Sequence, residues 1–196
     1  MKILVTGGSG FLGSNVADEL SRRGHQVVIF DKKKSKWIRP NQKMCIADIL
    51  NFKKLKKIIK GSDIVYHFAA LADLDQALTE PIKSVDVNIR GTVKILELCR
   101  KYNVKRFIYA STIYVNSVDG GFYRSSKKAA EDYIEEYYKR YGISFTILRY
   151  GSLYGLRATK SNGIFRIVNK ALKNKGLVKI SNFGKIFTQE GKFNWI

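Results

Sequence analysis

The stretch Thr6-Gly7-Gly8-Ser9-Gly10-Phe11-Leu12-Gly13 decides the fold of this chain. It follows an apolar segment, residues 2–5, and opens an amphipathic segment, residues 11–23, in which apolar side chains recur at helical spacing. Gly7 permits a tight turn, and Gly13 lets the helix lie close to the strand. The stretch therefore predicts a strand, a glycine-rich turn and a helix in direct succession.

Strand and helix patterns continue to alternate through residue 148. Short apolar runs predict strands, and longer segments with apolar residues on one face predict helices. The further strands are expected at residues 27–30, 44–46, 64–68, 107–110 and 145–148, and the further helices at residues 52–60, 81–102 and 123–141. Regular alternation of this kind indicates an α/β fold, a doubly wound parallel sheet of the Rossmann type with helices on both faces.

Asp31, directly after the second predicted strand, indicates which ligand the glycine turn accepts. Gly10 lets a pyrophosphate approach the backbone, where free N–H groups at a helix N-terminus can bind it. A carboxylate at this position can accept both hydroxyls of an adenosine ribose and would repel a 2′-phosphate, so we expect NAD rather than NADP. Lys32, Lys33 and Lys34 leave NADP open as the less favoured cofactor, because a cation beside the site tolerates the phosphate.

The chain has 196 residues and a formal net charge of +20, a balance that can mark a protein with an anionic partner. In residues 52–60, however, the apolar side chains share one helical face and lysines cover the rest. This arrangement is typical of an amphipathic helix with a solvated basic surface. The sequence shows no zinc-finger, RNA-binding or helix-turn-helix pattern, so we do not expect a nucleic-acid partner despite the basic charge.

Cys45 and Cys99 lie in apolar segments and lack the spacing of metal ligands, so no metal site is expected. This cysteine usage favours a reduced, cytoplasmic setting. The N-terminus lacks a secretory pattern, because Thr6, Gly7 and Gly8 interrupt its apolar run. No apolar run is long enough to cross a membrane, and we expect no membrane partner.

The glycine spacing Gly-x-x-Gly-x-x-Gly resembles that of the extended short-chain dehydrogenase/reductase family, the nucleotide-sugar epimerases and dehydratases. The resemblance continues to about residue 185 through a series of ordered motifs. These motifs are Ala47-Asp48-Ile49, His67-Phe68-Ala69-Ala70, Asn88-Ile89-Arg90-Gly91-Thr92, Tyr123-Arg124-Ser125-Ser126-Lys127, Leu148-Arg149-Tyr150 and Tyr154-Gly155. Several motifs in the family's order are far more specific than any one of them.

The resemblance implies which residues surround NAD and which carry the reaction. The implied cofactor-binding residues are Gly7, Gly10, Phe11, Leu12, Gly13, Asp31, Lys32, Asp48, Ile49, Phe68, Ala69, Ala70, Asn88, Tyr123, Lys127 and Tyr150. The implied catalytic residues are Thr112, Tyr123 and Lys127. Asn88 has a second interpretation, in which it only hydrogen-bonds backbone at a helix kink.

Tyr123 and Lys127 are one helical turn apart, so both side chains reach the same side of a helix. A tyrosine ordinarily loses its proton near pH 10, but a nearby ammonium stabilises the phenolate. We therefore expect Lys127 to lower the pKa of Tyr123 and to make it a general base near neutrality. Thr112, at the end of the fifth strand, would hydrogen-bond the reacting hydroxyl or carbonyl.

Ile113, the residue after Thr112, sets this chain apart from part of the family it resembles. The family's 4,6-dehydratases and decarboxylases place acidic residues here to move additional protons. Their absence favours an NAD-dependent nucleotide-sugar epimerase of the 4-epimerase type, acting by transient oxidation and hydride return. The alternatives are an NAD(P)-dependent reductase or dehydrogenase on a sugar nucleotide or small carbonyl, and an NAD-binding fragment impaired in catalysis.

Beyond Arg149 the periodic pattern weakens, although residues 163–173 predict a helix and residues 178–180 a short strand. Members of the family continue into a C-terminal substrate domain. We therefore expect residues 1–160 to form the NAD-binding domain and residues 161–196 a truncated segment of the substrate domain. The family also pairs through its two long helices, which suggests a homodimer through residues 81–102 and 123–141.

Overall fold

The computed structural model describes residues 1–159 and 162–173, and the strand expected at residues 178–180 lies outside them. The chain divides into two compact units, Met1–Gly151 and Ser152–Ile196. The first unit holds the sheet, and the second holds helix α7, Gly163–Lys173, where the sequence predicts a helix. The functional boundary expected at residue 160 stays a prediction.

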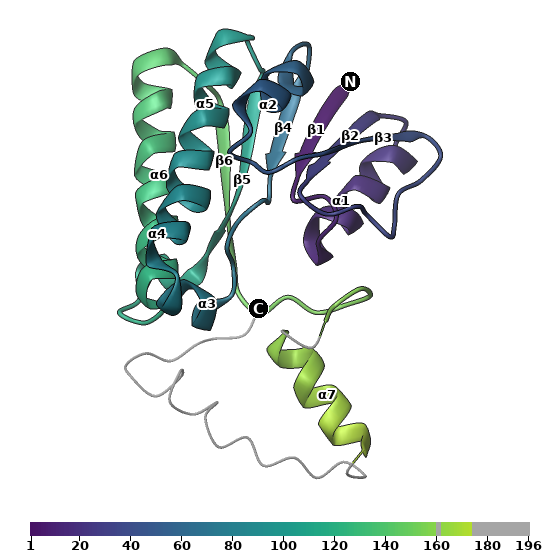
Figure 1. The fold of residues 1–196 in the computed structure, drawn as a ribbon, viewed down its shortest axis with the longest axis vertical. Helices are drawn as coiled ribbons and strands as arrows, with labels where there is room; N and C mark the ends of the chain where they lie inside the picture. The colour runs from purple at the N-terminus through teal and green to yellow at the C-terminus, as the bar shows by residue number, and fades with distance from the viewer. Residues whose placement is uncertain (160–161, 174–196) are drawn as a thin grey trace. The chain divides into compact units, whose positions relative to one another are not determined.

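The first unit is built on a parallel sheet with the strand order β3-β2-β1-β4-β5-β6 (Figure 1). Its strands are β1 Lys2–Thr6, β2 Gln26–Asp31, β3 Gln42–Ile46, β4 Ile64–His67, β5 Arg106–Thr112 and β6 Phe145–Tyr150. Its helices are α1 Phe11–Arg22, α2 Phe52–Ile59, α3 Leu74–Thr79, α4 Pro81–Ser84, the π-helix η1 Val85–Arg90, α5 Gly91–Lys101, the 3₁₀-helix η2 Ile113–Asn116 and α6 Gly121–Tyr141. The strand order reverses between β1 and β4, which confirms the predicted doubly wound Rossmann fold.

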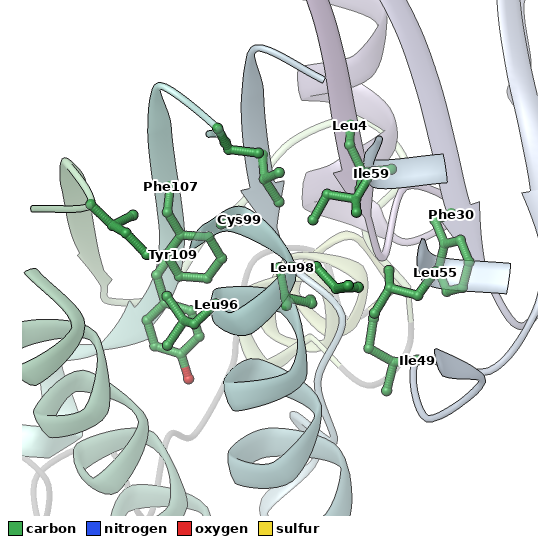
Figure 2. Close-up of a cluster of buried hydrophobic side chains, with 14 of the residues drawn as sticks. Leu4, Phe30, Ile49, Leu55, Ile59, Leu96, Leu98, Cys99, Phe107 and Tyr109 are labelled. Atoms are coloured by element: carbon green, nitrogen blue, oxygen red, sulfur yellow. The ribbon is translucent and has the colours of Figure 1, made fainter. Parts of the chain in front are cut away.

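The two faces of the sheet bury separate parts of the core, because successive side chains of a strand point to opposite faces. On one face Leu4 of β1 lies in a cluster with Leu55 of α2 and Leu96 of α5 (Figure 2). On the other face Ile3 of β1 packs with Leu20 of α1. Burial on both faces explains why the strands appear in the sequence as continuous apolar runs rather than as alternating ones.

The long helix expected over residues 81–102 is confirmed as an unbroken helical run, with a π-helical segment that was not predicted. The helical run consists of α4, η1 and α5, and it ends at Lys101. The π-helical segment η1 contains the buried Asn88. Such segments are rare in proteins as a whole, but those that occur are often found at functional sites. Gly91 begins α5, where an added Cβ would lie 3.3 Å from Ile49 Cγ2, so a small residue permits close packing there.

Two short elements, α3 and η2, escape the sequence patterns because they are too short to show a helical period. Helix α6 begins at Gly121 rather than at Tyr123, since Gly120 serves as its N-cap with a left-handed φ of 94°. These additions surround the carboxyl ends of β4 and β5. They leave the predicted order of strands unchanged.

Candidate active site

The glycine turn after β1 lies directly against the segment that follows β4. The two strands pair in parallel with Thr6 opposite His67, so their carboxyl ends are neighbours. A Cβ added at Gly7, whose φ is +70°, would lie 2.6 Å from Ala69 N. A Cβ added at Gly13 would lie 2.3 Å from Gly7 O. Neither distance accommodates a side chain, so this turn requires glycine at both positions.

Helix α1 begins at this turn without a side-chain cap. Its N-cap is Gly10, and the first turn carries no acidic residue. Phe11, Leu12 and Gly13 are its first residues, and the first N–H groups of a helix have no acceptor within the helix. These donors and the positive end of the helix dipole favour an anion. The turn therefore fits the pyrophosphate of a dinucleotide.

Asp31 at the end of β2 is anchored beside the glycine turn. Its Oδ2 accepts a hydrogen bond from Ser9 N at 3.0 Å, and its Oδ1 accepts one from Lys33 N at 2.9 Å. These two bonds fix the carboxylate at the edge where the adenosine ribose is expected. The neighbouring Lys32 is exposed.

The other predicted cofactor residues follow β3, β4 and β6. Residues 68–70 are half-buried after β4, and Tyr150 is half-buried at the end of β6. After β3, Ile49 is buried, whereas Asp48 is exposed and its Oδ1 accepts a backbone N–H of its own loop at 2.8 Å. Because carboxyl ends of parallel strands meet at one edge, the topology gathers these residues there. Their contact with NAD stays a prediction.

Asn88 in η1 joins three parts of the chain. Its Oδ1 accepts from Leu71 N at 2.8 Å, and its Nδ2 donates to Leu71 O at 3.0 Å and to Ser126 Oγ at 2.9 Å. The amide thus holds the segment after β4 against α6, next to Lys127. Of the two interpretations of this residue, these bonds agree with backbone binding at a helix kink. A direct contact with NAD stays a prediction.

His67 is enclosed by hydrogen bonds at the carboxyl end of β4. Its Nδ1 lies 2.7 Å from Thr6 Oγ1, and its Nε2 lies 3.0 Å from Thr92 Oγ1. Because Thr92 Oγ1 donates to Asn88 O at 2.6 Å, we assign the ring proton to Nε2 and an accepting role to Nδ1. Burial lowers the pKa of His67 to about 3. The neutral ring therefore joins β1, β4 and α5 rather than acting as an acid or base.

The three predicted catalytic residues come together at the carboxyl end of β5. Thr112 ends this strand, while Tyr123 and Lys127 lie on α6. Lys127 Nζ donates to Ala110 O at 2.8 Å and lies 5.9 Å from the centre of the Tyr123 ring. Thr112 lies close enough to the Tyr123 phenol to favour its ionised form. This arrangement can hold a sugar hydroxyl between a phenol and a threonine hydroxyl.

The expected lowering of the pKa of Tyr123 was wrong. Burial raises the pKa of Tyr123 to about 12, and the nearby Thr112 side chain opposes this shift only in part. Burial also lowers the pKa of Lys127 to about 7. The ammonium of Lys127 points to Ala110 O instead of the phenol oxygen. Desolvation therefore outweighs the charge of Lys127 at this site.

An ion pair between a buried carboxylate and a partly exposed arginine lies beside the site and was not predicted from the sequence. Glu131 Oε1 and Oε2 accept from Arg149 Nε and Nη2 at 3.1 and 2.7 Å. Glu131 is one helical turn after Lys127 on α6, and Arg149 lies on β6. The helical spacing of Lys127 and Glu131 could have pointed to their proximity, but the pairing with β6 depends on the crossover from α6 to the sheet.

Within residues 1–159 and 162–173, no group of three or more His, Cys, Asp or Glu side chains could hold a metal ion. No helix in this described part is long and apolar enough to span a membrane. Both cysteines are free thiols, with Cys99 in the core. The chemistry-bearing groups of the described site are hydroxyls, a phenol, an amide, the buried Lys127 and Glu131 on α6 and the partly exposed Arg149 on β6.

Comparison with known proteins identifies relatives along nearly the whole chain. A UDP-glucuronate 4-epimerase from Thermodesulfobacterium geofontis is 33% identical over 98% of this chain, and a dTDP-D-glucose 4,6-dehydratase from Dictyostelium discoideum is 31% identical over 89%. This chain spans 67% of that epimerase and 49% of that dehydratase. It spans 64% of a Methanocaldococcus jannaschii relative that is 33% identical over 88% of this chain.

Solved structures share the fold of the described residues. The UDP-glucose 4-epimerase of Thermotoga maritima with UDP-glucose has a TM-score of 0.83 and 30% identity, covering 94% of this chain and 67% of its own. The Thermus thermophilus UDP-glucose 4-epimerase in complex with NAD has a TM-score of 0.78 and 28% identity, covering 89% and 63%. The sequence model of the NAD-dependent epimerase/dehydratase family matches residues 3–193. This chain therefore belongs to the NAD-dependent epimerase/dehydratase family.

Proposed function

We propose that this protein is an NAD-dependent nucleotide-sugar 4-epimerase. The observation that carries the proposal is the position of Thr112, Tyr123 and Lys127 at the carboxyl end of β5, at the same sheet edge as the uncapped glycine turn. Relatives named as 4-epimerases, and structures holding UDP-glucose or NAD, support the same reaction class. UDP-sugars are accordingly the first substrates to test.

Each residue of the catalytic group has a distinct task in this proposal. The phenolate form of Tyr123 takes the proton of the sugar hydroxyl during oxidation, and the resulting phenol returns it after the hydride comes back on the other face. Thr112 orients that hydroxyl through its own hydroxyl. Lys127 supplies positive charge beneath Tyr123, which favours the phenolate. When bound, NAD would accept and return the hydride.

The cofactor would be held by residues already gathered at the sheet edge. The first-turn N–H groups of α1 would bind its pyrophosphate, because Gly10 leaves them without a side-chain cap. Asp31 would accept the ribose hydroxyls while keeping its bonds to backbone N–H groups. This arrangement favours NAD over NADP, since a 2′-phosphate would face the carboxylate.

Ile113 supports epimerisation over dehydration. It follows Thr112 at the start of η2, and the residue is 52% exposed. An apolar side chain there cannot move the second proton that elimination of water requires. Because a dehydratase relative and an epimerase relative are 31% and 33% identical to this chain, the choice between epimerisation and dehydration is tested directly.

The proposal is tested by incubating the protein with NAD and UDP-sugars and following the products by liquid chromatography and mass spectrometry. An epimer of unchanged mass without net NADH formation is the expected result. Tyr123→Phe should abolish turnover and leave NAD binding intact, because the ring is kept and only the proton carrier is lost. Full activity in this variant would refute the catalytic assignment. Loss of water from the sugar would instead indicate a dehydratase.

A reductase is the second candidate, favoured by the exposed Lys32, Lys33 and Lys34 after Asp31. These cations could tolerate the 2′-phosphate of NADPH. Net oxidation of NADPH by a sugar nucleotide or small carbonyl would support this reaction, which an epimerase does not perform. Cofactor binding without turnover of any tested substrate would support a purely NAD-binding role.

We also propose a homodimer through the helical run of residues 81–101 and α6. Ile82, Val85 and Tyr133 on these helices are 75%, 49% and 47% exposed, and exposed apolar groups favour a protein partner. Sedimentation velocity should show twice the monomer mass. Introduction of a charge with Ile82→Glu should return the protein to a monomer, while a dimer that persists in this variant would place the interface elsewhere.

A further inference from the structure

Glu131 is a fully buried carboxylate one helical turn beyond Lys127. Its exposed fraction is 0% and that of Lys127 is 3%, so both charges are withdrawn from water on the same side of α6. Arg149 on β6 holds Glu131 through two hydrogen bonds, at 3.1 and 2.7 Å. A buried carboxylate is costly unless it is paired in this way.

The ion pair has a defined orientation. The side chain of Arg149 is 41% exposed, whereas that of Glu131 is 0% exposed. The negative end of the pair thus lies in the interior near Lys127, and the positive end reaches solvent, where its field is screened. The net effect of the pair on the interior is therefore that of a negative charge.

Lys127 has few other groups that could balance its charge. Its Nζ lies 4.7 Å from the centre of the Tyr109 ring and donates to Ala110 O, contacts that supply partial negative charge only. The titratable groups that interact with it are Tyr109 on β5, Tyr123 and Glu131 on α6 and His67 on β4. Arg149 on β6 contacts Glu131, and the neutral Asn88 of η1 contacts the adjacent Ser126. Glu131 is the carboxylate among them, and its charge opposes the effect of burial on the pKa of Lys127.

We propose that Glu131 is a positioning residue for the catalytic pair, in which its carboxylate, held by Arg149, favours the ammonium form of Lys127 that is lodged against Ala110 O. This inference deepens the proposed function and rests on the role given there to Lys127. It goes beyond the catalytic trio because it assigns the charge of Lys127 to a second pair, Glu131 and Arg149, of which the carboxylate is buried. Without Glu131, burial would lower the share of ammonium at Lys127 near pH 7 still further and weaken the charge that favours the Tyr123 phenolate.

The test measures the pKa of Lys127 directly and needs no turnover. The full chain is labelled with lysine carrying ¹³C at Cε, and the Lys127 signal is assigned by its loss in Lys127→Arg. Glu131→Gln keeps the shape of the side chain and removes its charge. We expect the pKa of Lys127 to fall by at least about one unit in this variant, a tenfold loss of ammonium relative to amine.

Asp132→Asn is the matched control, because it removes one negative charge from the adjacent position of the same helix. Asp132 pairs with Lys128 at the surface and its side chain is 55% exposed, so the pKa of Lys127 should stay unchanged there. An unchanged pKa of Lys127 in folded Glu131→Gln overturns the proposal.

If Glu131→Gln alone fails to fold, the double variant Glu131→Gln/Arg149→Gln removes both charges and leaves two amides that can bond each other. The pKa of Lys127 should fall in this variant as well, because the removed carboxylate is the nearer and more buried charge. An unchanged pKa there also refutes the role of Glu131. The wild type is tested for turnover separately. If the pKa of Lys127 falls in the variants but the wild type turns over no UDP-sugar, the positioning role is supported and the proposed epimerase activity is refuted.

Discussion

Replacement of Lys127 by methionine should make this protein more stable at neutral pH. Burial lowers the pKa of Lys127 from 10.5 to about 7. Each pKa unit corresponds to about 1.36 kcal/mol, so holding the ammonium in the folded state costs roughly 4 to 5 kcal/mol below pH 7. Methionine has a similar unbranched shape but forfeits the charged hydrogen bond to Ala110 O, worth about 1.5 to 3 kcal/mol. The net expectation is a gain of about 2 kcal/mol.

The gain in stability from Lys127→Met should depend on pH, because the pKa of Lys127 is lower in the folded protein than in the unfolded chain. The folded pKa of Lys127 lies below the unfolded value, so the unfolded chain binds more protons between about pH 7 and pH 10.5. The free energy of unfolding of the wild type therefore rises with pH across this window, by up to about 1.4 kcal/mol per pH unit. The advantage of Lys127→Met should be complete at pH 6.5 and should vanish near pH 9.5.

Urea unfolding followed by circular dichroism at pH 6.5 and pH 9.5 measures both quantities. The control is Lys128→Met on the same helix, where only a surface ion pair with Asp132 is lost and a change below about 0.5 kcal/mol is expected. A destabilised Lys127→Met at pH 6.5, or a gain of equal size at both pH values, would refute the reasoning. A confirmed gain together with lost turnover would show a functional residue that reduces stability.

Two further predictions concern residues that shape the site. Asn88→Ala should lower the free energy of unfolding by about 2 to 4 kcal/mol, because it leaves buried backbone groups after β4 without partners. Thermal unfolding beside the exposed control Asn116→Ala measures this, and equal stability of the two variants would contradict it. Gly13→Ala should lose about 3 kcal/mol or more and bind NAD weakly, since its Cβ would lie 2.3 Å from Gly7 O. The control is Gly163→Ala, because no atom lies within 4 Å of its added Cβ. Calorimetric titration measures the NAD affinity of both variants, and equal affinities would rule out a special role for the turn.

The fold of the first unit could be predicted from local patterns. Buried parallel strands require continuous apolar runs, and the turn at Gly7 requires a residue that tolerates a positive φ, so both leave direct marks in the sequence. The positions of Thr112 and Tyr123 also followed from the order of the elements, because the end of β5 and the start of α6 are joined by a short connection. Such features depend on neighbours along the chain, which a sequence displays.

The electrostatics of the site were decided by the tertiary structure. Spacing placed Lys127 one turn from Tyr123, but the burial of both side chains raised one pKa and lowered the other, and burial has no local pattern. The partners of Asn88 and the pairing of Glu131 with Arg149 likewise join segments that lie far apart in the chain. The sequence by itself thus determined the turn, the sheet and the candidate catalytic side chains, whereas long-range packing decided their protonation and their supports, because desolvation and hydrogen bonding across the core exist only in the folded chain.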